Sequence, residues 1–230
     1  MKRCQLLRPG LVEYGEAWEI QRELFHARSQ SQIIDTLLIL QHPPTYTFGR
    51  RSQAGQLISS VETPKIPLNP PLLKGEKGGL NAAIFHVDRG GGATYHGPGQ
   101  LVGYPIVELK SYTTDFHTYL RMLEDVMIRT LADFNIQSQR RSGYTGVWVN
   151  GEKIASIGVR IIRGFTMHGF ALNVNNDLAP FDKIIPCNIN DVKMTSISKI
   201  SGTPLNIQEV EDSLIHNFAS VFNVKICILM

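Results

Sequence analysis

The sequence predicts a single α+β domain with a mixed β-sheet, and the prediction rests on three observations. Several short segments have the composition of β-strands, and two of the connections between them are typical of tight turns. Three longer segments carry apolar residues at helical spacing. The 230 residues show no internal repeat. Strands joined by tight turns and interspersed with helices are typical of the α+β class, so we expect residues 1–230 to form one domain.

Three helices are predicted from apolar residues that recur every three to four positions. The first such stripe covers residues 17–27, and the second, which is the strongest, covers residues 116–134. The third follows Asn206, which has the spacing of a capping box with Glu209. We expect all three stripes to face the core, and they indicate no chemistry.

Seven segments are predicted to be strands. Asn150-Gly151 joins two of them, and this dipeptide strongly indicates a hairpin because both residues accept a positive φ. Arg163-Gly164 offers a second tight turn that would continue an antiparallel meander. The predicted strands are residues 36–40, 83–87, 101–109, 145–149, 153–162, 165–174 and 224–229.

Residues 59–80 differ from the rest of the chain because they are rich in proline and glycine. Proline removes backbone donors and fixes φ, and glycine raises the entropy of the unfolded backbone, so neither a helix nor a central strand is expected here. We predict a mobile surface insertion. A linker between two domains is the alternative, but the segment before it is too short to bury a core of its own.

Charge and hydropathy argue against several classes of protein. No apolar run approaches the roughly 18 residues of a membrane span, and the N-terminus lacks the apolar stretch of a secretory signal. We therefore expect a cytoplasmic protein that does not act at a membrane. The net charge is only +3 and no basic cluster occurs, so a nucleic-acid partner is not expected. A mild positive field would instead suit an acidic protein partner.

The three cysteines, Cys4, Cys187 and Cys227, are far apart and lack the spacing of metal ligands. We therefore expect neither a disulfide framework nor a metal site. Cys227 lies in an apolar run and is predicted to fill the core. Cys187 lies between a proline and an asparagine, and these neighbours alone leave it either a buried thiol or a nucleophile.

A glycine-rich segment, residues 89–100, is the first candidate site. Glycine lets backbone N–H groups come close to a ligand. The segment does not match the nucleotide-binding patterns, because the residues after it are predicted to form a strand and not a helix. A glycine-rich hairpin with a hydrogen-bonded histidine is the alternative. The arginine, tyrosine, histidine and glutamine among the glycines favour a binding site.

Lys153 and Cys187 form the second candidate site. A thiol and an amine that lie together can share one proton, which makes thiolate attack feasible and leaves a base for a later step. The two residues are far apart in sequence, so only the fold can join them. Lys153 also opens a predicted strand, where an exposed lysine would be unremarkable. The residues alone leave this alternative open.

Four segments carry a resemblance to a known family. Residues 42–50, 89–100, 151–160 and 168–187 are similar to the motifs of the octanoyltransferases of lipoate biosynthesis. These enzymes belong to a wider family with the lipoate and biotin protein ligases. The resemblance covers about residues 10–200, apart from the insertion at 59–80. One departure is visible, because Asn188 stands where the family usually has glycine; asparagine accepts a left-handed backbone better than most residues.

The resemblance implies an α+β fold of the biotin/lipoate protein ligase type, with a central mixed sheet flanked by helices. It implies transfer of an octanoyl group from octanoyl-acyl carrier protein to a lysine of a lipoyl domain, without a cofactor. The expected acceptors are the lipoyl domains of 2-oxoacid dehydrogenase complexes and the glycine cleavage H protein. By the same resemblance Cys187 is the acyl-thioester nucleophile and Lys153 activates it. The implied substrate-binding residues are Arg89, Gly90, Gly91, Gly92, Ala93, Thr94, Tyr95, His96, Ser156, Ile157, Gly158, Gly169, Phe170 and Ala171.

Two other functions are compatible with the same motifs. The first is an ATP-dependent lipoate or biotin protein ligase, which activates a free acid as an adenylate. Such a ligase needs no cysteine nucleophile, so Cys187 argues against it. The second is a non-catalytic module that binds an acyl carrier or a lipoyl domain, and for such a module the substitution Cys187→Ser would have no effect.

Overall fold

The structure is a computed structural model that describes residues 1–52, 82–185 and 192–228. The predicted insertion at 59–80 lies outside the described residues, and so do Cys187 and Asn188.

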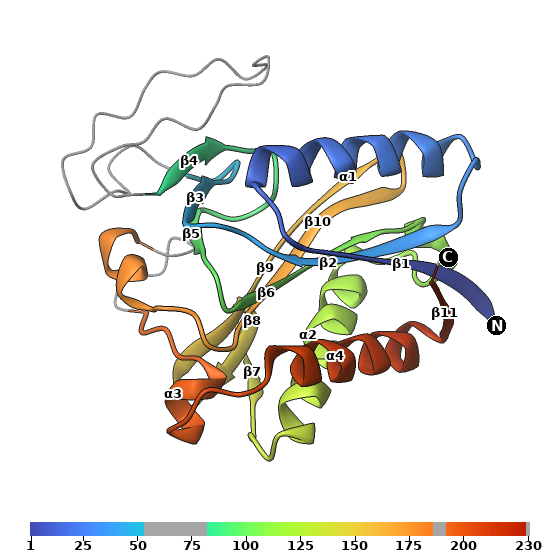
Figure 1. Cartoon of the computed structure of the whole chain (residues 1–230). Coiled ribbons are helices and arrows are strands. Elements are labelled where there is room, and N and C mark those ends of the chain that lie inside the picture. The colour runs from blue at the N-terminus through green and yellow to red at the C-terminus, as the bar shows by residue number, and fades with distance from the viewer. Residues whose placement is uncertain (53–81, 186–191, 229–230) are drawn as a thin grey trace.

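An eight-stranded mixed sheet forms the centre of the molecule, in the order β11-β1-β2-β6-β10-β9-β8-β7 (Figure 1). β1 pairs in parallel with both β11 and β2, and every other neighbouring pair is antiparallel. The predicted α+β fold with a central mixed sheet is therefore confirmed. The strands are β1 Lys2–Leu11, β2 Asp35–Gln41, β6 Gln100–Ile106, β7 Gln139–Arg141, β8 Tyr144–Val149, β9 Glu152–Ile162, β10 Phe165–Asn173 and β11 Val224–Ile228.

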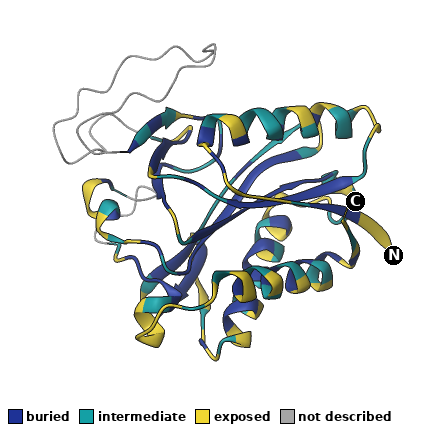
Figure 2. Ribbon diagram, viewed as in Figure 1, coloured by how far each residue is buried: buried dark blue, intermediate teal, exposed yellow. Residues whose placement is uncertain are grey.

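Helices cover both faces of this sheet. α1 (Tyr14–Ser29) lies on one face, and α2 (Phe116–Asp133) and α4 (Ile207–Phe222) lie together on the other (Figure 1). Figure 2 shows that the sheet is mostly buried and that α2 and α4 bury only their inner sides. The three helical stripes predicted from the sequence are thus confirmed. Three short helices complete the described chain: η1 Leu109–Ser111, η2 Ala179–Lys183 and α3 Ile197–Ser201.

The turns and caps follow the local sequence closely. Asn150 and Gly151 have φ values of 49° and 82°, and Arg163 and Gly164 have 51° and 85°, as two-residue hairpin turns require. Asn206 caps α4 as predicted, because its side chain accepts a hydrogen bond from the N–H of Gln208. Between Lys2 and Leu11, by contrast, β1 was not predicted, since its buried residues are flanked by charged and glycine positions.

A second, three-stranded sheet packs beside the first; its strand β4 was predicted, at residues 83–87, but β3, β5 and the sheet itself were not. Its order is β4-β3-β5, with β4 parallel and β5 antiparallel to the central strand. β5 lies inside the glycine-rich segment at residues 89–100, for which no strand was predicted. Two other predictions are corrected: the strand expected at 101–109 ends at Ile106, and Cys227 is only half-buried, because β11 is an edge strand. The strands of the small sheet are β3 Thr45–Phe48, β4 Ala83–His86 and β5 Ala93–His96.

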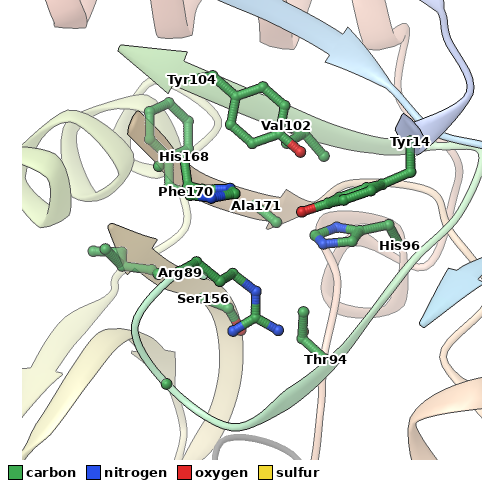
Figure 3. Close-up of a pocket in the computed structure, with 14 residues that line it drawn as sticks. Tyr14, Arg89, Thr94, His96, Val102, Tyr104, Ser156, His168, Phe170 and Ala171 are labelled. Carbon is green, nitrogen blue, oxygen red and sulfur yellow. The ribbon is translucent and has the colours of Figure 1, made fainter. Parts of the chain in front are cut away.

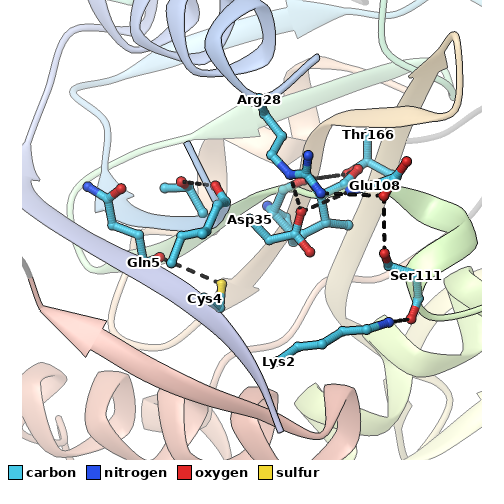
Figure 4. A network of polar contacts seen from close by, with 12 residues as sticks. Lys2, Cys4, Gln5, Arg28, Asp35, Glu108, Ser111 and Thr166 are labelled. Atoms are coloured by element: carbon cyan, nitrogen blue, oxygen red, sulfur yellow. Dashed lines mark hydrogen bonds and ion pairs between the residues drawn. The ribbon is translucent and has the colours of Figure 1, made fainter. Parts of the chain in front are cut away.

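A polar network fixes the end of α1 to the large sheet (Figure 4). The buried Asp35 carboxylate accepts hydrogen bonds from Arg28 Nε at 2.6 Å, from the Tyr112 hydroxyl at 2.6 Å and from the Glu108 N–H at 3.1 Å. Arg28 also pairs with Glu108 at 3.5 Å. Burial, followed by the hydrogen bond to Asp35, raises the pKa of Tyr112. The network ties α1, β2 and the end of β6 together. Among the described residues, no helix is both long and apolar enough to cross a membrane.

Candidate active site

A narrow cleft opens between the two sheets. Strands β9 and β10 form one wall, and the segment that leads into β5 forms the other (Figure 3). Its lining residues are Tyr14, Arg89, Gly91, Thr94, His96, Val102, Tyr104, Ser156, Ile157, Gly158, His168, Gly169, Phe170 and Ala171.

Three separate segments that the sequence singled out meet in this cleft. Their ten lining members are Arg89, Gly91, Thr94, His96, Ser156, Ile157, Gly158, Gly169, Phe170 and Ala171. They come together because β9 and β10 pair side by side, with Ile157 opposite Phe170 and Gly158 opposite Gly169.

Four other candidates from the same segments do not line the cleft. Along β5, Thr94 and His96 line it, whereas Ala93 and Tyr95 pack into an apolar cluster with Phe181. This division follows from the alternation of side chains in a strand. The Gly90 N–H donates to Val159 O at 3.1 Å, and the Gly92 carbonyl accepts from Gly49, so both hold the loop in place.

Sequence reasoning missed four lining residues: Tyr14, Val102, Tyr104 and His168. Tyr14 begins the first helix, and the other three lie in strands assigned to the core. His168 alone stood inside a motif that carried the resemblance, so its position in that motif was the one available signal.

Arg89 spans one side of the cleft and is held by its own sheet. Its guanidinium donates to Thr47 Oγ1 at 2.8 Å, to Thr47 O at 2.7 Å and to Gly90 O at 2.9 Å. On its other side Arg89 packs against β9 at Gly158. Only glycine leaves the space for this contact, because a Cβ at Gly158 would lie 2.9 Å from Gly90 O and 3.0 Å from Arg89 Cδ. The cation is 93% shielded from solvent, because the residue is 7% exposed. A fixed, buried positive charge therefore faces the cleft.

Two buried histidines, His96 and His168, line the cleft, and a third, His42, lies beside His96; all three are neutral at pH 7. Burial lowers the pKa of His42 to about 4 and that of His168 to about 3, and it places the pKa of His96 well below its usual range. The charge of Arg89 contributes to the lowering at His96 and His168. Because a neutral imidazole has one donor and one acceptor nitrogen, the partner of the first fixes the role of the second.

The hydrogen bonds decide which nitrogen carries the proton. His42 Nδ1–H donates to Val12 O at 2.8 Å, so its Nε2 accepts from the Tyr104 hydroxyl at 2.8 Å. His96 Nδ1–H donates to Gln100 Oε1 at 2.8 Å, which leaves a lone pair on its Nε2. In the cleft, His96 can therefore accept a hydrogen bond, and as a neutral imidazole it does not serve as an acid at neutral pH.

Lys153 is buried, with 1% of its surface exposed, so the alternative of an ordinary exposed strand lysine is wrong. Its amine lies 5.5 Å from the centre of the Trp148 ring. Gly146 provides the space for it, because a Cβ there would lie 2.8 Å from Lys153 Cε. Lys153 does not line the cleft but precedes Ser156, which does, by three positions on β9.

The backbone of Lys153 is paired with a neighbouring segment. Its N–H donates to Lys193 O at 2.8 Å, and its carbonyl accepts from the Thr195 N–H at 2.9 Å. This segment resumes the described chain a few residues after Cys187. Within the parts of the chain that the structure describes, no group of three or more His, Cys, Asp or Glu could hold a metal ion.

Comparison with known proteins identifies the family. Residues 13–219 match the model of the lipoyl protein ligase A/B catalytic domain. The chain belongs to the lipoyl protein ligase A/B family. This family membership confirms the resemblance and the fold that the sequence predicted.

Relatives within the lipoyl protein ligase A/B family share much of the sequence. The chain is 47% identical to an octanoyltransferase of Rubrobacter xylanophilus over 93% of its length and 90% of the relative's. It is 42% identical to an octanoyltransferase of Gloeobacter violaceus over 98% of its length and 93% of the relative's.

Solved structures show the same fold at lower identity. A putative lipoate protein ligase from T. acidophilum superposes with a TM-score of 0.68 at 15% identity, over 99% of this chain and 88% of that one. A biotin protein ligase from Aquifex aeolicus gives a TM-score of 0.51 at 12% identity, over 97% and 70% of the two chains.

Proposed function

We propose that the chain is an octanoyltransferase of protein lipoylation that takes its octanoyl group from octanoyl-acyl carrier protein and passes it through Cys187 to a lysine of a lipoyl domain. The observation that carries the enzyme class is the near full-length identity of 37–47% to octanoyltransferases. The transfer makes the chain an acyltransferase. The lipoyl domains of 2-oxoacid dehydrogenase complexes and the glycine cleavage H protein are the acceptors we propose.

The reaction has two steps that balance without an energy source. The Cys187 thiolate attacks the carrier thioester, a new C–S bond forms, and the carrier thiol leaves. The acceptor amine then attacks the acyl-cysteine, and an amide forms as the cysteine thiol leaves. Exchange of one thioester for another is nearly neutral in free energy, and conversion of a thioester to an amide is favourable. ATP is therefore not required.

Lys153 is the residue we propose for proton transfer. A base must take the proton of the attacking thiol, return a proton to the departing carrier thiol and then accept one from the acceptor amine. Lys153 is buried, and its backbone is bonded to the segment that follows Cys187 in the chain. Ile184 and Met194, which flank that part of the chain, pack in one apolar cluster, and this supports the pairing.

The cleft offers a suitable place for the acyl chain. Val102, Ile157, Phe170 and Ala171 supply apolar wall, and most of the remaining lining comes from glycines and the polar groups described above. Burial of each methylene group stabilises the bound chain by about 0.8 kcal/mol. We propose that the ten cleft residues predicted from the sequence contact the acyl group, and that Gly90, Gly92, Ala93 and Tyr95 position them.

Intact mass spectrometry tests the proposal. The protein is mixed with octanoyl-acyl carrier protein without ATP, and we expect a covalent octanoyl adduct that a lipoyl domain then removes. The adduct should be absent in Cys187→Ser and present in the control Cys227→Ser, whose half-buried thiol lies on β11. For Lys153→Ala we expect transfer to slow by about 10²–10⁴-fold, with the exposed Lys199→Ala as its control.

Two results would contradict the proposal. An adduct that persists in Cys187→Ser would exclude this cysteine as the nucleophile. Acylation of the lipoyl domain that occurs only with free octanoate and ATP would identify an ATP-dependent ligase, the activity named for a solved protein of the same fold, lipoate-protein ligase A bound with ATP.

A further inference from the structure

His168 has an unfavourable backbone conformation at a buried position of the cleft wall. Its φ is 57°, in the left-handed region that residues with a Cβ seldom adopt, although it lies within β10. The side chain is 1% exposed, and its backbone N–H donates to Gln21 Oε1 at 2.9 Å. Strained residues of this kind concentrate at functional sites, so the structure points to a role for the imidazole beyond packing.

The hydrogen bonds of His168 fix its tautomer. Nε2 lies 2.7 Å from Asp88 Oδ1, and Asp88 also pairs with Arg160, so Nε2 carries the proton and donates it to the carboxylate. Nδ1 then holds a lone pair. It has no hydrogen-bond partner among the described residues, although it is shielded from solvent. Most buried acceptors of this kind have a partner, so an unmet one indicates a place for a water molecule or for a polar group of a ligand.

His168 lines the cleft, and two of its neighbours on α1 carry unmet donors. Gln21 Nε2 and Trp18 Nε1 are also buried without a partner in the described part of the chain. Gln21 is bonded to the backbone of His168 through its other amide atom, and the Trp18 and His168 rings are 6.3 Å apart. One acceptor beside two donors matches a hydroxyl group, which both donates and accepts. A carboxylate or an ammonium would satisfy only one kind of partner.

The register of the sheet places this site at the far end of the acyl chain. A Cβ added at Gly146 would lie 2.8 Å from Lys153 Cε and 2.5 Å from Ala155 O. Because both atoms are close to the same point, the Lys153 amine lies near the level of Ala155 on β9. His168 pairs with Val159, four residues further along that strand, which corresponds to roughly 13 Å.

An octanoyl chain fits this distance. Its seven C–C bonds of about 1.5 Å span on the order of 9 Å when extended. A hydrogen-bonding distance of about 3 Å between the Lys153 amine and the reacting carbonyl accounts for most of the difference between this length and the roughly 13 Å along β9. Figure 3 shows His168 and Tyr104 on one side of the cleft, opposite Arg89 and Thr94. The eighth carbon would therefore end beside His168.

We propose that His168, Gln21 and Trp18 form a hydroxyl-binding site at the end of the acyl cleft, and that the enzyme therefore transfers 8-hydroxyoctanoyl groups as well as octanoyl groups. The inference rests on the proposed octanoyl transfer. With an octanoyl group bound, a water molecule occupies the site. With an 8-hydroxyoctanoyl group bound, the terminal hydroxyl takes that water's place, donates to His168 Nδ1 and accepts from Gln21 or Trp18.

A comparison of two carrier thioesters tests the inference. Octanoyl- and 8-hydroxyoctanoyl-acyl carrier protein are compared in one assay with the same lipoyl domain. We expect kcat/KM for the hydroxylated substrate to lie within about tenfold of that for octanoyl, because the site replaces the hydrogen bonds that the hydroxyl loses on leaving water. Absence of octanoyl transfer would refute the proposed function. Octanoyl transfer with rejection of the hydroxylated substrate by about 100-fold or more would refute this site alone.

Variants separate a hydroxyl site from an open cleft end. His168→Phe removes the lone pair and should worsen the preference for the hydroxylated substrate by roughly tenfold, whereas His86→Phe, at an exposed position of β4, should leave it unchanged. Because phenylalanine is strained at a φ of 57°, Trp18→Phe serves as a second variant that removes one N–H donor and leaves the β10 backbone unaltered. An unchanged preference in both variants would overturn the proposal.

A spectroscopic measurement tests the tautomer independently of turnover. In protein labelled with ¹⁵N-histidine, the ring of His168 should show a protonated Nε2 and an unprotonated Nδ1 at pH 7, assigned by the signal lost in His168→Phe. The Nδ1 resonance should shift further in the 8-hydroxyoctanoyl enzyme than in the octanoyl enzyme. A proton on Nδ1 would leave no acceptor and would contradict the inference.

Discussion

The two faces of the large sheet are built on opposite principles. The face covered by α2 and α4, here called the apolar face, is filled by residues such as Leu123, Met127 and Phe218, which are fully buried. The face covered by α1 and the small sheet, here called the cleft face, buries Arg89 and three histidines. Glu124 is an exception on the apolar side, where Arg121 and Arg140 pair with it.

The difference shows where stability and function are separated. Burial of an aliphatic or aromatic side chain stabilises the fold by roughly 1.5–3 kcal/mol and needs no specific partner. A buried polar group instead costs free energy unless each donor and acceptor is matched. On the cleft face Arg89, His42 and His96 are held by hydrogen bonds in a fixed geometry, whereas one nitrogen each of His168, Gln21 and Trp18 has no partner among the described residues. The main gain from these bonds is orientation.

The first prediction concerns the apolar face and has the largest expected effect on stability. Leu123→Ala removes a fully buried side chain of α2 and should lower the free energy of unfolding by about 2–5 kcal/mol. Octanoyl transfer at a temperature where the variant is folded should be unchanged. Urea unfolding and the transfer assay measure the two quantities.

The control for this variant is Leu11→Ala, because Leu11 is 59% exposed at the end of β1. Its effect on the free energy of unfolding should stay within about 0.5 kcal/mol. A large loss of transfer in folded Leu123→Ala would break the separation between the two faces.

The second prediction concerns the cleft face and pH. The folded pKa values of His42 and His168, about 4 and about 3, lie below the ordinary value near 6.5. The unfolded chain therefore binds more protons in this window. The stability that these neutral histidines contribute is fully present above about pH 6.5 and is lost as the pH falls toward the folded values.

When the pH falls from 7 to 5, each of these two histidines should lower the free energy of unfolding by about 2 kcal/mol, because only the unfolded chain takes up its proton in this range. Urea unfolding at the two pH values measures the difference. His42→Gln should reduce it by about that amount, while His216→Gln, at an exposed position of α4, should not alter it. A difference that stays the same in His42→Gln would mean that His42 is protonated in the folded protein.

The apolar face was largely predictable from the sequence because its signals are local. The stripe of α2 repeats every three to four residues, and the cap of α4 depends on one nearby asparagine. The two hairpin turns likewise depend on the residues within them. Such features need no knowledge of distant partners.

The cleft face was predictable only in part because its signals are not local. β3 and β5 pair with each other although the insertion at 59–80 separates them in sequence, so their strand character depends on a partner that no short window contains. The burial of Lys153 depends on a glycine in the neighbouring strand. The tautomer of His168 depends on Asp88, far away in sequence. Family motifs indicated most of the lining residues, but not these relationships.

The third prediction concerns the space around Lys153 and compares two variants that should differ by only about 1–2 kcal/mol in unfolding free energy. Gly146 and Gly143 both have positive φ values, 131° and 79°, so alanine is strained at either position. They differ in surroundings, because a Cβ at Gly146 would meet Ala155 O at 2.5 Å and Lys153 Cε at 2.8 Å, whereas one at Gly143 would meet nothing within 4 Å.

The pair Gly146→Ala and Gly143→Ala therefore separates the cost of conformation from the cost of space. Gly143→Ala should lose about 1 kcal/mol of unfolding free energy and keep full octanoyl transfer. Gly146→Ala should lose about 1–2 kcal/mol more, because either the lysine or the strand must move. Transfer should also fall in Gly146→Ala, through kcat rather than KM, since the displaced group is the proposed proton acceptor and not part of the acyl cleft. Equal transfer rates in the two variants would show that the position of Lys153 does not limit the reaction.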